Sequence, residues 1–169
     1  MFVEPYALYQ FDEKQSGGQT TDKGSWKAGG DLKWAINPKA VLDLTVNTDF
    51  AQADVDREVN NLERFNVFFP ERRQFFLENS GIWAGAGDNV IVPFFSRRIG
   101  LQGEFNAAPA PIDAGARFTD RTEGRTLAGL YIHQGETEQS AAANFGVLRY
   151  LKNYGSQNNI GAMLTHRLD

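Results

Sequence analysis

The sequence predicts an all-β chain that folds as an antiparallel, up-and-down transmembrane β-barrel, or a fragment of one, with a long inward-folded loop. Three observations predict this fold. Polar and apolar residues alternate with period two, as in half-buried strands. The predicted strands run for about ten residues, whereas soluble strands average about five or six and a membrane-spanning strand needs about 9–11. The connections alternate between short and long, as in barrels that cross a membrane.

The clearest strands form a hairpin in "DLKWAINPKAVLDLTV". A strand over residues 3–12 and a polar loop over 13–24 precede it. Strands 26–36 and 40–49 then flank "NPK", a turn because proline fixes its own φ and donates no hydrogen bond. A three-residue loop pairs Ile36 with Ala40. That register places Lys33 opposite Asp43 on the polar face and Trp34 opposite Leu42 on the apolar face.

Four further strands are predicted over residues 111–120, 125–134, 141–151 and 157–168, joined by a short turn, a loop of medium length and another short turn. The connection from residue 50 to 110 is by contrast very long. The total of seven strands is odd, and single-chain bacterial barrels have even numbers of strands. We therefore expect residues 1–169 to form one partial barrel domain. An eight-stranded barrel with a further strand inside 90–110 is the alternative.

The two parities of the strands predict two faces. In a transmembrane barrel the apolar parity faces lipid and the polar parity faces the lumen, whereas in a soluble sandwich the apolar parity faces a core. Strand length and connection length favour the membrane. The residues expected to face lipid are Leu32, Trp34, Leu42, Leu44, Ala114, Ala116, Phe118, Ile160, Ala162 and Leu164.

Inside the long connection, residues 61–83 read "NLERFNVFFPERRQFFLENSGIW", which is both aromatic and charged. Five Phe rings need burial, because a large exposed apolar patch is avoided unless it binds something. The charges need polar partners. We therefore interpret residues 50–110 as a plug folded into the lumen, with a cap over the rim as the alternative. The candidate contacts are Glu63, Arg64, Glu71, Arg72, Arg73 and Glu78 of the loop with Lys33, Asp43, Asp113 and Arg117 of the strands.

Composition excludes several functions. The net charge is -4 and the pI about 5.2, so no basic surface for nucleic acid is indicated. The chain has no Cys, which excludes disulfides and thiolate metal sites. No run of 18 apolar residues predicts a transmembrane helix. No cofactor is predicted.

Carboxylates raise two chemical hypotheses that ion pairing and solvation explain better. Glu63, Glu71 and Glu78 could supply the pair that a glycosidase needs, but salt bridges within the plug are favoured, so no catalytic residue is predicted. An acidic stretch of the loop suits a hard cation such as calcium but lacks the EF-hand glycine and spacing. The weak metal candidates are Asp49, Asp54 and Asp56.

Several blocks resemble one family of Gram-negative outer-membrane proteins. They are "DLKWAINPKAVLDLTVNTDFAQADVD", the stretch over residues 61–83, "FFSRRIG", "NFGVLRY" and "NIGAMLTHR", in conserved order over about residues 25–168. In that family a β-barrel follows a module similar to family-nine carbohydrate-binding domains. The resemblance implies the outer membrane of a Gram-negative bacterium and a missing upstream module. It implies no reaction.

The favoured function is a plugged outer-membrane channel or transporter that handles glycans or other envelope solutes. Its expected partners are the lipid bilayer and a glycan. The alternative from another class is a barrel-embedded hydrolase acting on an envelope glycan or lipid, and an enzyme is the less favoured reading. The second alternative is a soluble β-rich ligand-binding module.

Overall fold

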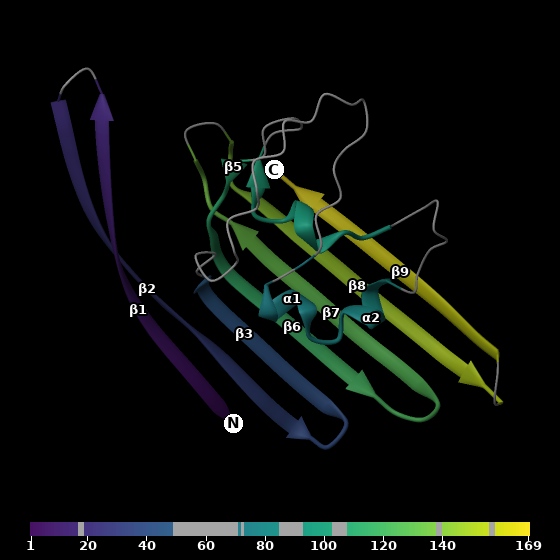
Figure 1. Cartoon of the computed structure of the whole chain (residues 1–169). Helices are drawn as coiled ribbons and strands as arrows, with labels where there is room; N and C mark the ends of the chain where they lie inside the picture. Colours follow the sequence, from purple (N-terminus) through teal and green to yellow (C-terminus); the bar gives the residue numbers. More distant parts are fainter. Residues whose placement is uncertain are drawn as a thin grey trace.

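Residues 1–16, 19–48, 71, 73–84, 93–102, 108–137, 140–155 and 158–169 are described by the computed structural model. They contain a seven-stranded antiparallel sheet with the order β1-β2-β3-β6-β7-β8-β9 (Figure 1). Its strands are β1 Phe2–Ser16, β2 Gln19–Asn37, β3 Ala40–Thr48, β6 Ile112–Arg121, β7 Arg125–Gln134, β8 Ala143–Tyr154 and β9 Asn158–Leu168. β3 pairs with β6 across the long connection, and the other pairs are between consecutive strands. The all-β, up-and-down prediction is confirmed. Within the described residues, β1 and β9 each pair on one side alone, so the sheet is open.

The β2–β3 hairpin has the predicted register but a different turn. Lys33 pairs with Asp43 and Trp34 with Leu42, as expected from the alternation. The prediction that Ile36 pairs with Ala40 is wrong, because a bulge at Ile36 brings Asn37 opposite Ala40. The Asn37 Oδ1 atom accepts hydrogen bonds from the backbone amides of Lys39 (2.8 Å) and Ala40 (3.0 Å). The asparagine side chain therefore closes a turn shorter than the predicted one.

The predicted polar loop over residues 13–24 is wrong, because β1 and β2 continue through most of it. Backbone pairing extends from Phe2 opposite Lys33 up to Ser16 opposite Gln19. β3 ends its pairing with β2 at Gly30, so the rest of the β1–β2 hairpin projects beyond the sheet (Figure 1). Polar residues favour a loop locally, but pairing with a second strand overrides that preference.

The other connections follow the predicted alternation of lengths. The short turns after β2, β6 and β8 lie at one end of the sheet, and the longer connections lie at the other end (Figure 1). Two residues each form β4 (Leu101–Gln102) and β5 (Ala108–Pro109), which pair only with one another. Among the described residues of this region, neither β4 nor β5 joins the main sheet as an eighth strand.

The two faces of the sheet differ in what they contact. We call one the covered face, because the described part of the long connection (residues 71, 73–84 and 93–102, the covering segment) lies on it (Figure 1). The main apolar core lies between the covering segment and the covered face of the sheet. Its buried members are Phe76, Ile82, Trp83 and Ile99 of the segment and Ile112, Ala128, Leu130, Ile132 and Val147 of the strands.

The opposite surface, the open face, carries the other parity. Large apolar side chains are exposed there, among them Trp26 at 76% and Leu164 at 68%. None of the ten side chains predicted to face lipid is buried. On β7 both parities are apolar because one packs on the covering segment and the other forms part of the open face.

Among the described residues, no helix is long and apolar enough to cross a membrane.

Candidate functional site

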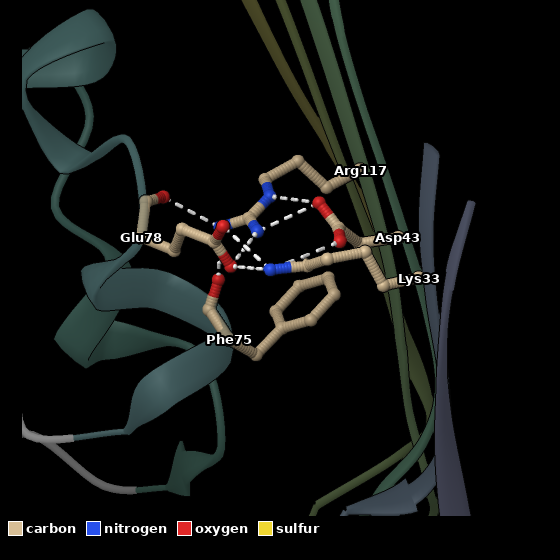
Figure 2. Close-up of polar contacts among 5 residues, drawn as sticks. All are labelled: Lys33, Asp43, Phe75, Glu78 and Arg117. Atoms are coloured by element: carbon tan, nitrogen blue, oxygen red, sulfur yellow. Dashed lines mark hydrogen bonds and ion pairs between the residues drawn. The ribbon is translucent and has the colours of Figure 1, made fainter. Parts of the chain in front are cut away.

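Arg117 is the centre of a polar cluster on the covered face. Its side chain is 2% exposed. Nε and Nη2 donate to Asp43 Oδ2 on the neighbouring strand at 3.0 and 2.7 Å. Nη1 donates to the backbone carbonyl oxygens of Phe75 and Glu78 in the covering segment. One guanidinium therefore holds a strand carboxylate with one edge and two backbone carbonyls of the segment with the other (Figure 2).

Lys33 and Glu78 complete the charge cluster (Lys33, Asp43, Glu78 and Arg117). The Lys33 ammonium donates to both carboxylate oxygens of Glu78. Arg117 Nη2 also donates to Glu78 Oε2 at 3.1 Å. The second Asp43 oxygen, Oδ1, lies 3.8 Å from Lys33 Nζ. Two cations and two carboxylates therefore meet where the segment touches β2, β3 and β6 (Figure 2).

Short local elements present Glu78 to the strands. Helix α1 covers Gln74–Leu77 and helix α2 covers Ser80–Ala84. Asn79 between them has φ 59°, the left-handed conformation that asparagine tolerates better than most residues, and its carbonyl accepts the Ile82 amide at 2.9 Å. The break between the helices leaves the Glu78 carbonyl available to Arg117.

Gly115 on β6 lies next to Phe75 of the covering segment, at a point where the neighbouring strands leave no room for a Cβ atom. A Cβ atom there would stand 2.7 Å from Thr45 Cγ2, 2.9 Å from Ile132 Cδ1 and 3.4 Å from Phe75 Cζ. The side chains of Thr45 and Ile132 on the adjacent strands would therefore have to shift, whereas the Phe75 ring of the segment lies at ordinary contact distance from that position. The Arg117 guanidinium carbon lies 5.2 Å from the centre of the same ring, which adds a cation–π contact.

A second ion pair ties the segment to itself. Arg73 Nε and Nη2 donate to the two oxygens of Glu71, each at 2.7 Å, and Ser96 Oγ donates to Glu71 Oε2 at 2.7 Å. Arg73 also donates to the carbonyls of Ile99 (2.6 Å) and Ser96 (2.8 Å). Its guanidinium carbon lies 4.1 Å from the centre of the Phe76 ring. Arg73 therefore bonds a carboxylate, but this carboxylate is Glu71 of the segment and not one of the strand carboxylates proposed from the sequence.

Side-chain contacts also dock the second part of the covering segment, which contains the 3₁₀ helix η2 (Ser96–Arg98). Gln134 at the end of β7 accepts the backbone amide of Gly100 at 2.9 Å. Gly100 has φ 80°, a conformation that glycine adopts without strain. Ile99, 1% exposed, belongs to the core above β7. Apolar packing and charge therefore fix the segment at neighbouring places on the sheet.

The two glutamates of the segment are held as anions. The hydrogen bonds from Lys33 lower the pKa of Glu78 against a smaller opposing effect of burial, and the charges of Lys33 and Arg117 lower it further. Burial raises the pKa of Glu71, but Arg73 and Ser96 outweigh it, so that the pKa is also lowered. A general acid needs a raised pKa. Neither carboxyl is therefore suited to protonate a leaving group, as the hydrolase alternative requires.

The structure brings together part of the predicted set. Lys33, Asp43, Glu78 and Arg117 meet, whereas Glu71 and Arg73 pair nearby. Asp113 is separate, because the bulge between Ile112 and Ala114 removes it from the alternation, and its carboxylate lies 3.8 Å from His133 Nε2. The predictions that lie outside the described residues are Glu63, Arg64, Arg72, Asp49, Asp54 and Asp56.

Sequence reasoning missed the polar partners that are not charged. The carbonyls of Phe75 and Glu78, the Ser96 hydroxyl and the Gln134 amide carry no signal of their own in the sequence. The position of Gln134 on β7 could have directed attention to it, because this polar residue ends the apolar row of Ala128, Leu130 and Ile132 on the covered face. Over the described part of the chain, no three His, Cys, Asp or Glu side chains group as metal ligands would.

Comparison with curated proteins and comparison with solved structures each found no match. A protein-family model, described as a domain of unknown function (DUF5916), matches residues 1–126. The matched region contains β1, β2, β3 and β6 and every residue of the charge cluster. Since the match covers well over half of the 169 residues, the chain belongs to the DUF5916 family.

Proposed function

We propose that this chain forms part of the wall of a β-barrel in the outer membrane of a Gram-negative bacterium. The covering segment acts as a plug in its lumen, and the barrel conducts or transports small envelope solutes, glycans among them. The observation that carries the proposal is the difference between the two faces of the sheet. One face holds buried charges under a segment bonded to them, and the other exposes rows of apolar side chains. A lipid-facing outside and a polar, plugged inside have this arrangement.

Two Trp residues on the open face support a membrane boundary at each end. Trp26 and Trp34 stand eight positions apart on β2, and Trp26 is 76% exposed beside Tyr9, with ring centres 4.9 Å apart. Eight residues of strand span roughly 26 Å, or roughly 20 Å vertically at a tilt of about 40°. The apolar band of such barrels is about 25 Å tall and flanked by aromatic girdles. The spacing therefore fits one Trp near each girdle.

The plug is tested by replacing residues 61–83 of the whole protein with a Gly/Ser linker of equal length. The replacement removes Phe75, Phe76, Glu78, Ile82 and Trp83 but keeps the length of the connection. We expect a higher single-channel conductance in planar bilayers, because the linker has neither the apolar core contacts nor the ion pairs that hold the segment in the lumen.

Circular dichroism provides the control for this replacement, since the variant must keep its strand content. Unchanged conductance in a folded variant would contradict the plug and place the segment outside the conducting path. A membrane-inserted protein with no conductance before or after the replacement would contradict the channel itself.

The lipid-facing surface is tested by tryptophan fluorescence in vesicles of brominated phosphatidylcholine. Three variants each keep one Trp and carry Phe in place of the other two. We expect quenching of Trp26 and Trp34, because bromine on the acyl chains reaches side chains of the open face. Trp83 is the matched control, since it belongs to the covering segment, is 6% exposed in the core between the segment and the sheet, and should keep its emission. Equal emission from all three would instead indicate the soluble module.

A further inference from the structure

We infer that Lys33 and Arg117 form a binding site for the carboxylate of a transported solute, and that the Glu78 side chain fills this site while the segment is docked. The inference rests on the proposed function, because it names the solute class that a lumen with this wall would take. Each hydrogen bond that the described part of the segment accepts from the two cations ends on an oxygen: both oxygens of the Glu78 carboxylate and the carbonyls of Phe75 and Glu78.

The cations belong to the sheet and do not leave with the segment. Lys33 lies on β2, Arg117 on β6 and Asp43 on β3 between them. With Glu78 in place, two positive and two negative charges balance. Without it, Lys33, Arg117 and Asp43 leave one net positive charge on the wall. Loss of the Glu78 carboxylate releases the donors of Lys33 Nζ and the one on Arg117 Nη2 that now serves Glu78. The two donors on Arg117 Nη1 bond backbone carbonyls and are released only if the segment itself moves away.

Arg117 is also held in position for such a ligand. Asp43 binds Nε and Nη2 along one edge of the guanidinium, which fixes its plane. A guanidinium fixed in this way presents its remaining donors in a geometry that matches a carboxylate. Solvent also reaches the site, since the side chains of Lys33 and Glu78 are 42% and 41% exposed. A solute can therefore reach the site at the border of the covering segment.

The ligand class follows from the group already bound. Glu78 supplies a single carboxylate with two acceptor oxygens, and one negative charge neutralises the wall. In a barrel that handles glycans, a sugar with a carboxyl group has this chemistry. Glucuronate is a suitable probe, and glucose is its neutral counterpart of nearly the same size.

The test measures glucuronate binding to the whole protein in detergent by titration calorimetry. Glu78→Gln keeps the size of the side chain but removes the competing charge, so we expect it to bind glucuronate at least about tenfold more tightly than the unsubstituted protein does. Adding Lys33→Gln to Glu78→Gln should abolish the gain. The matched control is Glu123→Gln, which removes an exposed carboxylate from the β6–β7 turn and should leave the affinity unchanged. Glucose should not bind to any of these proteins.

Three results would overturn the inference. They are equal glucuronate affinity with and without the Glu78 carboxylate, a gain that survives Lys33→Gln, and tighter binding of inorganic phosphate than of glucuronate. Glu78→Ala repeats the titration if Glu78→Gln does not fold. These outcomes do not depend on conductance. A barrel that binds glucuronate as expected but passes no current would contradict the proposed channel and leave the anion site standing.

Discussion

Replacing Arg117 with Ala is expected to lower the free energy of unfolding by about 3–5 kcal/mol, the cost of breaking a buried ion pair by removing one partner. The Asp43 side chain is 7% exposed and would lose both hydrogen bonds that it accepts from Arg117. Lys33, at 3.8 Å from its other oxygen, compensates in part. Two backbone carbonyls of the segment also lose their donor. Urea titration followed by circular dichroism measures the loss.

Two further variants separate this mechanism from a general loss of charge. Arg125→Ala is the matched control, because Arg125 pairs with Asp120 at 3.2 Å but its side chain is 54% exposed. An exposed ion pair contributes about 0–1 kcal/mol. Arg117→Met combined with Asp43→Leu should recover much of the loss, since replacing both partners with apolar residues leaves neither charge buried without the other. A loss below 1 kcal/mol for Arg117→Ala would mean that the pair does not hold the segment.

The sheet could be predicted from the sequence because its information is local. Alternation over the β2–β3 hairpin determines which side chains share a face, and a shift of one residue would place Lys33 and Asp43 among apolar neighbours. The register of this hairpin was therefore predictable to the residue. The bulge at Ile36 was not, since it depends on the Asn37 side chain bonding to the turn in place of the ladder.

For contacts between distant parts of the chain, the sequence predicted the type of interaction but not the residues that make it. The composition of residues 61–83 indicated burial and charge pairing, and the described part shows both. Which charges pair depends on distances that the alternation does not contain. Arg73 bonds Glu71 two positions away, whereas Arg117 reaches Glu78 across 39 positions. Asp113 shares the parity of Arg117 in the sequence, yet a bulge separates it from the cluster.

In the projecting part of the β1–β2 hairpin, local sequence features predicted a loop where the structure has two paired strands. Gly, Ser, Thr and Asp between residues 13 and 24 match a loop in every local respect. The backbone nevertheless pairs up to Ser16 and Gln19, because the register begun at Phe2 and Lys33 continues without interruption. Pairing of two long strands extends a ladder at little cost per residue once it has started. Local composition therefore underestimates the length of a hairpin that projects from a sheet.

Replacing Leu44 with Arg is expected to cost about 2–4 kcal/mol in a bilayer, because Leu44 stands at the middle of β3 on the open face. Its cross-strand neighbours, Leu32 and Ala116, are apolar, so no carboxylate on either adjacent strand opposes the new charge. The same change on a surface in water would cost no more than about 0.5 kcal/mol. Urea titration of the protein folded into phosphatidylcholine vesicles measures the difference.

A residue near the membrane interface provides the control that distinguishes lipid from any other apolar environment. Ile160 lies on the same face, but near the start of β9 beside a short turn, and it is 62% exposed. Ile160→Arg should therefore cost only about 0–1 kcal/mol, as Arg does near the membrane interface. Ala141→Arg, in an exposed connection, should cost little in any medium. A cost that falls from Leu44 to Ile160 requires a medium whose polarity changes along the strand, which a bilayer has and water lacks. Equal small costs at both positions would place the open face in water and remove the membrane from the proposed function.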